Sequence, residues 1–177
     1  MKPILTLCAQ PLFEARGSPI RVKAFLRSLG EEGLSCEVVT LPVGPDAELP
    51  PGVTVRRVPN LIGVKTVPIG PSLSKLFFGK LIAVRAFVRA FPRRFRIIHG
   101  IEEMGLPAWI IARLCGARFV FEKHSDPVSH RTKSFGRKMV MGAYAAVERF
   151  VCRRADVIIA TGLGLAEQAR SYGTHAK

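Results

Sequence analysis

Six short apolar runs, rich in β-branched residues and mostly separated by stretches of helical periodicity, constrain the fold of this chain more than any other feature. The runs are ILTLCAQ, CEVVTL, VTVRRVP, RIIHGI, RFVFEKH and DVIIATG, and they begin at residues 4, 36, 53, 96, 118 and 156. Each has the length of a strand, and strands that alternate with helices are typical of a parallel sheet with helices on both faces. The sequence therefore predicts an α/β, Rossmann-like fold, with residues 1–177 as one domain.

Start and stop signals place the helices between these strands. Ser18 is a suitable N-cap, Pro19 suits the first helical position, and Gly30 or Gly33 can end this first helix. Pro92 ends a long second helix. The predicted helices are residues 18–33, 72–91, 105–117, 135–155 and 163–173, and the predicted loops are residues 42–52 and 60–71.

Basic residues outnumber acidic ones, and their distribution along the chain is uneven. The formal net charge is +14, and residues 49–101 contain ten Lys and Arg but no Asp or Glu. Such a block indicates a negatively charged partner, which could be nucleic acid, anionic lipid or a phosphorylated substrate. Charge alone does not choose among these three classes.

The composition excludes several other classes of protein. Hydrophobic residues make up 48% of the chain and charged residues 23%, as in a soluble globular domain rather than a disordered one. No apolar run reaches the about 18 residues of a transmembrane helix, and the N-terminal run is predicted to be a strand rather than a signal peptide. The four cysteines show no C-x-x-C spacing. This favours buried thiols in a reducing cytoplasm over disulfides.

Ligands of open α/β sheets bind beyond the carboxyl ends of the strands, so the residues that follow each strand are candidate site residues. Gly17 and Ser18 precede a helix N-terminus, which favours an anion. Arg21 and Lys23 lie in the first turn of that helix, where cations oppose the helix dipole. A bound phosphate would offset the repulsion between these two cations and the helix dipole. Alternatively, both side chains point to solvent. The loop is not G-x-G-x-x-G, which disfavours a dinucleotide cofactor.

Two adjacent carboxylates follow the fourth predicted strand. Glu102 and Glu103 could accept hydrogen bonds from sugar hydroxyls, or they could stabilise the N-terminus of the helix that starts near Gly105. Spacing alone does not decide between these roles.

The fifth predicted strand ends in a second group of candidate site residues. His124 lies between Lys123 and Ser125 and could bind a phosphate or a sugar hydroxyl, transfer a proton, or be an ordinary loop histidine. Thr161 follows the sixth strand and completes the candidate edge. His99 lies within its strand and is predicted to be a core histidine, and His130 is expected at the surface. The histidines lack the tight spacing of a zinc site, so no metal is expected.

The second predicted helix, residues 72–91, suggests a membrane contact. Its predicted core face consists of Leu73, Leu76, Phe77, Leu81, Val84, Phe87, Val88 and Phe91. Phe78 and Ile82 then fall among the cations Lys75, Arg85 and Arg89 on the opposite face. Large apolar groups among cations suit the surface of an anionic bilayer. Alternatively, another segment of the chain covers Phe78 and Ile82.

Four stretches of the sequence, in this order, resemble one protein family. They are QPLFEARGSPIRVKAFLRSLGEEGLSCEVVT, FRIIHGIEEMGLPAWIIAR, RFVFEKHSD and ERFVCRRADVIIATGLGLAEQAR. Together they resemble the N-terminal, "glycosyltransferase 4-like" domain of the retaining, GT-B-fold glycosyltransferases of family 4. The resemblance extends over nearly the whole chain, and it implies a single Rossmann-like half of a GT-B fold.

The resemblance implies roles for particular residues. Gly17 and Ser18 correspond to the glycine pair that approaches the donor diphosphate and the acceptor, although Ser18 replaces the second glycine. His124 corresponds to the histidine near the transferred sugar, and Glu102 falls near the acceptor cleft. Thr161 stands where the family often has serine.

The resemblance also implies partners and a location. The nucleotide-sugar donor is a co-substrate held mainly by a C-terminal donor-binding domain that this sequence does not include, so this domain alone is expected to be inactive. No cofactor or metal is expected. The acceptor would be a saccharide or a lipid-linked saccharide, and the enzyme would be cytoplasmic or peripheral on the inner face of the membrane.

One alternative is a basic nucleic-acid- or phosphometabolite-binding α/β module without catalytic activity. Nucleic acid is the less favoured partner, because the sequence shows no helix-turn-helix, RNA-recognition or zinc-finger signature and contains only one Trp and two Tyr. A steep salt dependence of binding would distinguish nucleic-acid affinity from the other readings.

Overall fold

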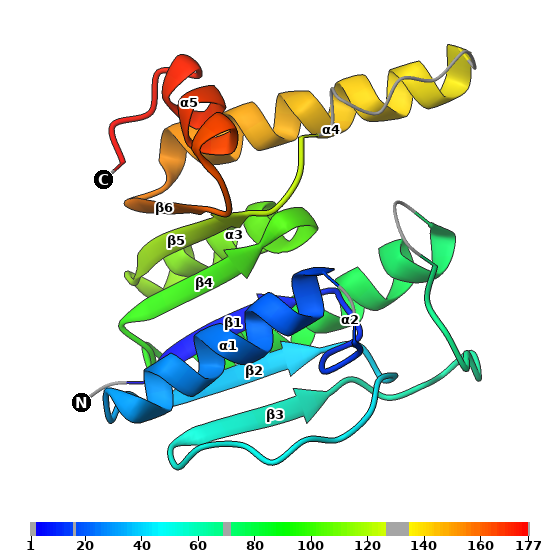
Figure 1. Cartoon of the computed structure of the whole chain (residues 1–177), viewed down its shortest axis with the longest axis vertical. Helices are drawn as coiled ribbons and strands as arrows, with labels where there is room; N and C mark the ends of the chain where they lie inside the picture. The colour runs from blue at the N-terminus through cyan, green and yellow to red at the C-terminus, as the bar shows by residue number, and fades with distance from the viewer. Residues whose placement is uncertain (1–2, 16, 69–71, 127–134, 177) are drawn as a thin grey trace.

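All six predicted strands pair in one parallel sheet, in the order β3-β2-β1-β4-β5-β6 (Figure 1). The structure, a computed structural model, describes residues 3–15, 17–68, 72–126 and 135–176. The strand order reverses between β1 and β4, which makes the carboxyl ends of these two strands the expected binding edge. The strands are β1 (Ile4–Cys8), β2 (Cys36–Thr40), β3 (Val53–Arg57), β4 (Ile97–Ile101), β5 (Arg118–Lys123) and β6 (Val157–Ala160).

Helices cover both faces of the sheet, as predicted. Helix α1 lies on one face, α2 and α3 lie on the other, and α4 packs against α3 and β5 (Figure 1). None of the helices in the described part of the chain is long and apolar enough to cross a membrane. The helices are α1 (Gly17–Glu31), α2 (Leu73–Ala90), α3 (Gly105–Cys115), α4 (Phe135–Arg154) and α5 (Leu163–Ser171), with a short 3-10 helix, η1 (Glu102–Met104), before α3.

Local sequence signals set both ends of α2 but not the start of α1. Ser72 is the N-cap of α2, and its Oγ accepts a hydrogen bond from the backbone N–H of Lys75 at 3.2 Å. Helix α2 ends two residues before Pro92, which cannot continue it. Helix α1 begins at Gly17, so Ser18 lies in its first turn and the prediction of Ser18 as N-cap is wrong.

The orientation of α2 reverses the sequence prediction. Phe78 and Ile82 are fully buried against the sheet, whereas the residues predicted as the core face are mostly exposed. Small residues explain why this side of α2 is the buried one. Ala86 and Ala90 are buried on the same side as Phe78 and Ile82, and they let the helix approach the sheet closely. Phe78 and Ile82 therefore cannot contact a membrane, and that prediction is wrong.

The three cations predicted to join that membrane contact bind protein groups instead. Lys75 forms an ion pair with Glu103, Arg85 donates a hydrogen bond to the backbone oxygen of Arg57, and Arg89 binds the carboxylate of Glu37. Carboxylates of the domain thus neutralise Lys75 and Arg89, which contradicts their predicted role at a bilayer. Arg85 binds only a neutral backbone oxygen.

Glu37 connects β2 to α2 and gives a first stability prediction. Its carboxylate oxygens accept hydrogen bonds from Arg89 at 2.6 and 2.7 Å, and Arg56 lies 2.9 Å away. Burial opposes ionisation of Glu37, but the two arginines outweigh it and lower its pKa. We expect Glu37→Gln to lower the free energy of unfolding by about 2 kcal/mol at pH 7, measured by urea unfolding.

The pH dependence of this effect follows from the lowered pKa of Glu37. The folded state binds its proton less readily than the unfolded chain, so the stabilisation is complete above the unfolded pKa of about 4.3 and is lost as the pH falls through the folded value. The difference between the wild type and Glu37→Gln should therefore shrink below about pH 4. The exposed Glu48 supplies the control substitution, Glu48→Gln, which should change stability little at either pH. A pH-independent difference would contradict this account.

Candidate active site

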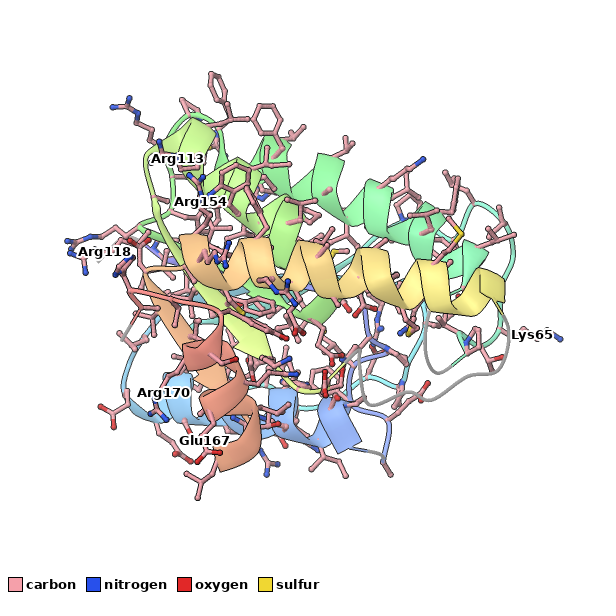
Figure 2. The ribbon with its side chains drawn as sticks, turned by 90° about the horizontal axis from the view of Figure 1, so that it is seen from above. Lys65, Arg113, Arg118, Arg154, Glu167 and Arg170 are labelled. Atoms are coloured by element: carbon pink, nitrogen blue, oxygen red, sulfur yellow. The ribbon has the colours of Figure 1, made fainter. Side chains whose placement is uncertain are left out.

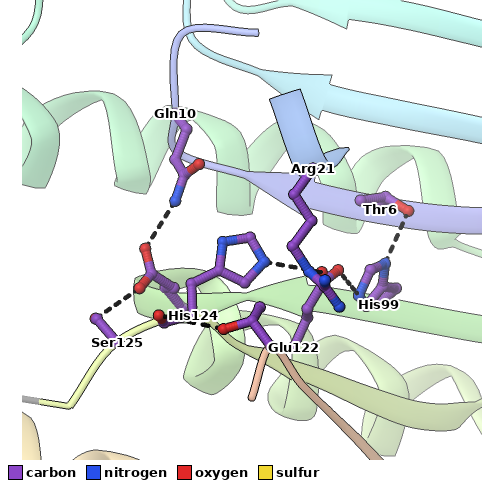
Figure 3. A network of polar contacts seen from close by, with 9 residues as sticks. Thr6, Gln10, Arg21, His99, Glu122, His124 and Ser125 are labelled. Carbon is purple, nitrogen blue, oxygen red and sulfur yellow. Dashed lines mark hydrogen bonds and ion pairs between the residues drawn. The ribbon is translucent and has the colours of Figure 1, made fainter. Parts of the chain in front are cut away.

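The carboxyl ends of β1, β4 and β5 bring together a network of polar side chains (Figure 3). Strand pairing sets this arrangement, because Thr6 of β1 lies in register with His99 of β4, and Ile101 of β4 lies in register with Glu122 of β5. The network therefore lies at the edge of the sheet where the strand order reverses, which is where open α/β sheets bind ligands.

Glu122 is the centre of this network. Its side chain is 1% exposed, and one oxygen, Oε1, lies 2.8 Å from His124 Nε2 and accepts a hydrogen bond from Arg21 Nε at 3.1 Å. The other oxygen, Oε2, lies 3.1 Å from His99 Nε2, at ion-pair distance but without hydrogen-bond geometry. Burial opposes ionisation, yet the contacts with His124 and His99 outweigh it and hold the pKa of Glu122 well below its usual range.

His99 is a core histidine, as the sequence predicted. It is 1% exposed, its Nδ1 lies 3.3 Å from Thr6 Oγ1, and its ring meets that of Phe25 edge-on with centroids 5.0 Å apart. These contacts hold the imidazole ring beside Glu122. His99 is therefore a buried support of the network and does not face the binding edge.

The side chain of His124 lies inside the network. It is 4% exposed, with Nε2 directed at Glu122, while Nδ1 is buried and has no hydrogen-bond partner in the described part of the chain. A buried nitrogen without a partner is uncommon. Nδ1 is thus the ring atom of His124 that lacks a partner among the described residues, and it is not open to solvent in this structure.

Glu102 links three segments at the same edge. Its Oε2 accepts a hydrogen bond from Gln10 Nε2 at 2.7 Å, and its Oε1 accepts one from Ser125 Oγ at 2.7 Å. The backbone of Glu102 has a positive φ of 48°, which is uncommon for a residue with a side chain. Gly100 permits this tight turn, because a Cβ there would lie 2.6 Å from the Cβ of Ala108 at the start of α3.

The two adjacent carboxylates face different partners. Glu103 pairs with Lys75 of α2 at 3.2 Å, away from the partners of Glu102. Burial raises the pKa of Glu103 above its usual range, and Lys75 offsets only part of this effect. The structure thus separates the pair and brings only Glu102 into the polar network.

Lys123 does not face the binding edge, which contradicts its predicted role in ligand binding. Its side chain is fully buried, and its ammonium group lies 2.6 Å from Glu148 of α4 and donates a hydrogen bond to the backbone oxygen of Ser125 at 2.8 Å. The charge therefore connects β5 to α4 instead of reaching a phosphate.

The remaining predicted site residues lie around the same edge. Gly17 and Ser18 form the first turn of α1, and a Cβ at Gly17 would meet no atom within 4 Å. Arg21, four residues after Gly17 on the same helix, reaches Glu122, while Thr161 Oγ1 donates a hydrogen bond to the backbone oxygen of His124 at 3.4 Å. His130 lies outside the described residues.

Sequence analysis did not identify Glu122, Gln10 and Thr6 as members of the site. A signal was present for Glu122, since a carboxylate within an otherwise apolar strand must have a partner once the strand is buried. Gln10 and Thr6 carry no comparable signal, because neutral polar residues are common near strand ends.

The cysteines have the buried, unpaired state that the sequence predicted. All four are free, and burial raises the pKa of Cys8 and Cys152 to about 12 and that of Cys36 to about 11. Thiols with such values are poor nucleophiles. Within the described residues, no group of three or more His, Cys, Asp or Glu could hold a metal ion.

Solved structures of glycosyltransferases share this fold. Sucrose-phosphate synthase from Thermosynechococcus elongatus superposes with a TM-score of 0.72 at 19% identity, over 99% of this chain and 46% of that one. HepE from Anabaena, solved with UDP and glucose, superposes with a TM-score of 0.63 at 14% identity, over 99% of this chain and 42% of that one. UDP-glucose: anthocyanidin 3-O-glucosyltransferase, solved with UDP, superposes with a TM-score of 0.60 at 9% identity, over 97% of this chain and 51% of that one. This chain thus spans about half the length of these proteins.

The fold is the Rossmann-like fold found in one half of these GT-B glycosyltransferases. No match was found among curated proteins. Residues 16–177 match the family described as "Glycosyl transferase 4-like domain", and the chain belongs to that family. The family and the fold that the sequence predicted are both confirmed.

Proposed function

We propose that this domain is the acceptor-side half of a retaining, nucleotide-sugar-dependent glycosyltransferase. The observation that supports this most is the carboxylate of Glu102, held between Gln10 and Ser125 beside the His124–Glu122 pair. A carboxylate and hydroxyl-bearing side chains suit the recognition of sugar hydroxyls. A second, donor-binding domain would face this edge and close the cleft.

The proposed reaction assigns a role to each part of the edge. The bond between the anomeric carbon of the sugar and the phosphate oxygen of the donor breaks, and a bond to the acceptor oxygen forms on the same face of the sugar. The acceptor hydroxyl loses its proton to the departing phosphate oxygen. The N-terminus of α1, at Gly17 and Ser18, would stabilise the charge on the diphosphate through its N–H groups. No metal or other cofactor is required in this proposal.

His124 would contact the transferred sugar through Nδ1, the ring atom without a protein partner in the described chain. Because Nδ1 is buried, this contact requires the groups that cover it to shift when the sugar binds. Glu122 would fix the orientation of the ring by binding Nε2. Arg21 binds Glu122 and would act through it, as a positioning residue rather than a direct phosphate ligand.

UDP-sugars are the first donors to test, because the solved structures of HepE and of the anthocyanidin glucosyltransferase contain UDP. The acceptor would be a saccharide or a lipid-linked saccharide. The free, buried cysteines support a cytoplasmic location in this proposal.

The test is a transfer assay with the enzyme that contains this domain and a donor-binding domain. UDP-, GDP- and ADP-sugars would be combined with free and lipid-linked saccharides, and the anomeric configuration of the product would be determined by NMR. We expect a product with the configuration of the donor, and no turnover by the 177-residue chain alone. Transfer with inversion would overturn the retaining mechanism, and no transfer from any nucleotide sugar would overturn the proposed function.

Glu102→Gln tests the acceptor role within the same assay. Loss of one charged hydrogen-bond acceptor should raise the acceptor KM about tenfold, with a much smaller change in kcat. Glu103→Gln is the matched control, because Glu103 faces Lys75 and not the other residues of the edge. A lower melting temperature with an unchanged KM would mean that Glu102 only stabilises the start of η1 and α3.

A further inference from the structure

The outer surface of α2 is apolar along its whole length. Leu76, Val84 and Val88 are each more than half exposed, and Phe87 and Phe91 lie one turn apart with ring centroids 6.1 Å from each other. The inner side of the same helix is buried against the sheet. A helix that is apolar on both sides is normally covered on both sides. We define the outer helical surface as Leu73, Leu76, Phe77, Val84, Phe87 and Val88 of α2, its C-cap Phe91, and Ile110 and Leu114 of α3, all of which are exposed.

The outer helical surface is basic as well as apolar. The sequences of α2 and α3 contain no Asp or Glu, and the exposed Lys80 and Arg113 lie among the apolar residues. Figure 2 shows Arg113 and Arg154 at one end of this side of the molecule, next to the ends of α3 and α4. In α4 the guanidinium group of Arg154 lies 5.2 Å from the ring centroid of Phe150. Large apolar groups therefore alternate with cations across neighbouring helices.

We propose that the outer helical surface binds the surface of an anionic lipid bilayer. The apolar side chains of α2 would enter the boundary between headgroups and acyl chains, and Lys80 and Arg113 would bind anionic headgroups. An α-helix of 18 residues is about 27 Å long, so α2 can lie flat on the bilayer over its whole length. The residues involved differ from Phe78 and Ile82, which are buried in the core.

Charge argues for a bilayer over a second copy of this chain. Two copies that met through this surface would bring Lys80 and Arg113 of both toward one another, with no carboxylate on α2 or α3 to compensate them. An anionic bilayer supplies the opposite charge together with an apolar interior. The inference does not depend on the proposed catalytic function, because it rests on the face of the sheet that carries α2 and not on the binding edge.

The experiment is co-sedimentation of the 177-residue chain with neutral phosphatidylcholine vesicles and with vesicles containing phosphatidylglycerol. We expect binding to the anionic vesicles to be at least about tenfold stronger, since each cation near the surface contributes about 1 kcal/mol. Val88→Glu and Lys80→Glu should each weaken this binding by about fivefold or more. Leu163→Glu on α5 and Arg27→Glu on α1 are the matched controls, because both side chains are exposed on other parts of the molecule and both should leave binding nearly unchanged.

Three outcomes would overturn the proposal. Absence of binding to anionic vesicles would exclude the bilayer directly. Equal losses for Lys80→Glu and Arg27→Glu, with no loss for Val88→Glu, would show that net charge alone drives binding. A dimer in light scattering that Val88→Glu dissociates would assign the surface to a second copy. Circular dichroism of every variant would confirm that folding is retained, which is expected because the substituted side chains are exposed.

Discussion

Replacement of Glu122 by glutamine is expected to lower the free energy of unfolding by about 3 kcal/mol at pH 7, which corresponds to a drop of about 10 °C in melting temperature. The carboxylate is buried and lies within 3.1 Å of His99, His124 and Arg21. Glutamine has nearly the same shape, but it carries no charge and its amide nitrogen cannot accept a hydrogen bond. At least one of the three partners then loses the oxygen that it contacts, and two of them, His99 and His124, are buried.

The loss of stability caused by Glu122→Gln should be larger at neutral pH than at acidic pH. Because the pKa of Glu122 is lowered in the folded state, its contribution to stability is complete above the unfolded pKa of about 4.3 and is lost as the pH falls toward the folded value. Urea unfolding at pH 7 and at pH 3 should therefore show a large difference between the wild type and Glu122→Gln at pH 7 and a smaller one at pH 3.

The control for this prediction is Glu167→Gln, which removes an exposed carboxylate on α5 (Figure 2). It should change the free energy of unfolding by less than about 0.5 kcal/mol. If Glu122→Gln behaved like this control, the carboxylate would not be the centre of the network, and the positions of His99 and His124 would have to be fixed by packing alone.

His124→Ala is expected to lower the kcat of the complete two-domain enzyme about 100-fold, if His124 contacts the transferred sugar as proposed. The same change should lower the free energy of unfolding by only about 1 kcal/mol, because it removes one hydrogen bond to Glu122 and leaves Arg21 in place. Steady-state kinetics of transfer and urea unfolding of the variant would measure the two effects separately.

Two other histidines provide the controls for His124→Ala. His175 is exposed near the C-terminus, so His175→Ala should alter neither turnover nor stability. His99→Ala should reduce stability more than turnover, because His99 is buried behind Glu122. Full turnover by His124→Ala would remove this residue from the site, whatever the effect on stability.

The strands were predictable because their apolar runs are short and are bounded by helical patterns, so the sheet and its binding edge followed directly. The face of α2 was not predictable, since apolar residues surround this helix and its buried side is decided by close approach through Ala86 and Ala90. Sequence periodicity favours the larger side chains as the core, whereas packing against the sheet selected Phe78 and Ile82.

The position of the candidate site in the fold could be predicted from the sequence, but the contacts of its side chains could not. Loop residues such as Glu102 and Ser125 were found because they follow strands that end at one edge. The direction of a side chain depends on partners distant in sequence, and these were not visible. Lys123 turns to Glu148 of α4, while Glu122, one position earlier, turns to the histidines.

The carboxylate of Glu102 has a consequence for the speed of an acceptor's arrival and departure. Both of its oxygens already accept hydrogen bonds, from Gln10 and Ser125. Each oxygen has a second lone pair that can accept a hydrogen bond from a sugar hydroxyl, so the acceptor need not displace Gln10 or Ser125. The two protein donors instead fix the direction of these lone pairs before the acceptor arrives. Because the carboxylate is already ordered, an acceptor of the proposed enzyme binds without waiting for this side chain to turn, and its departure depends on the hydrogen bonds that the acceptor itself makes.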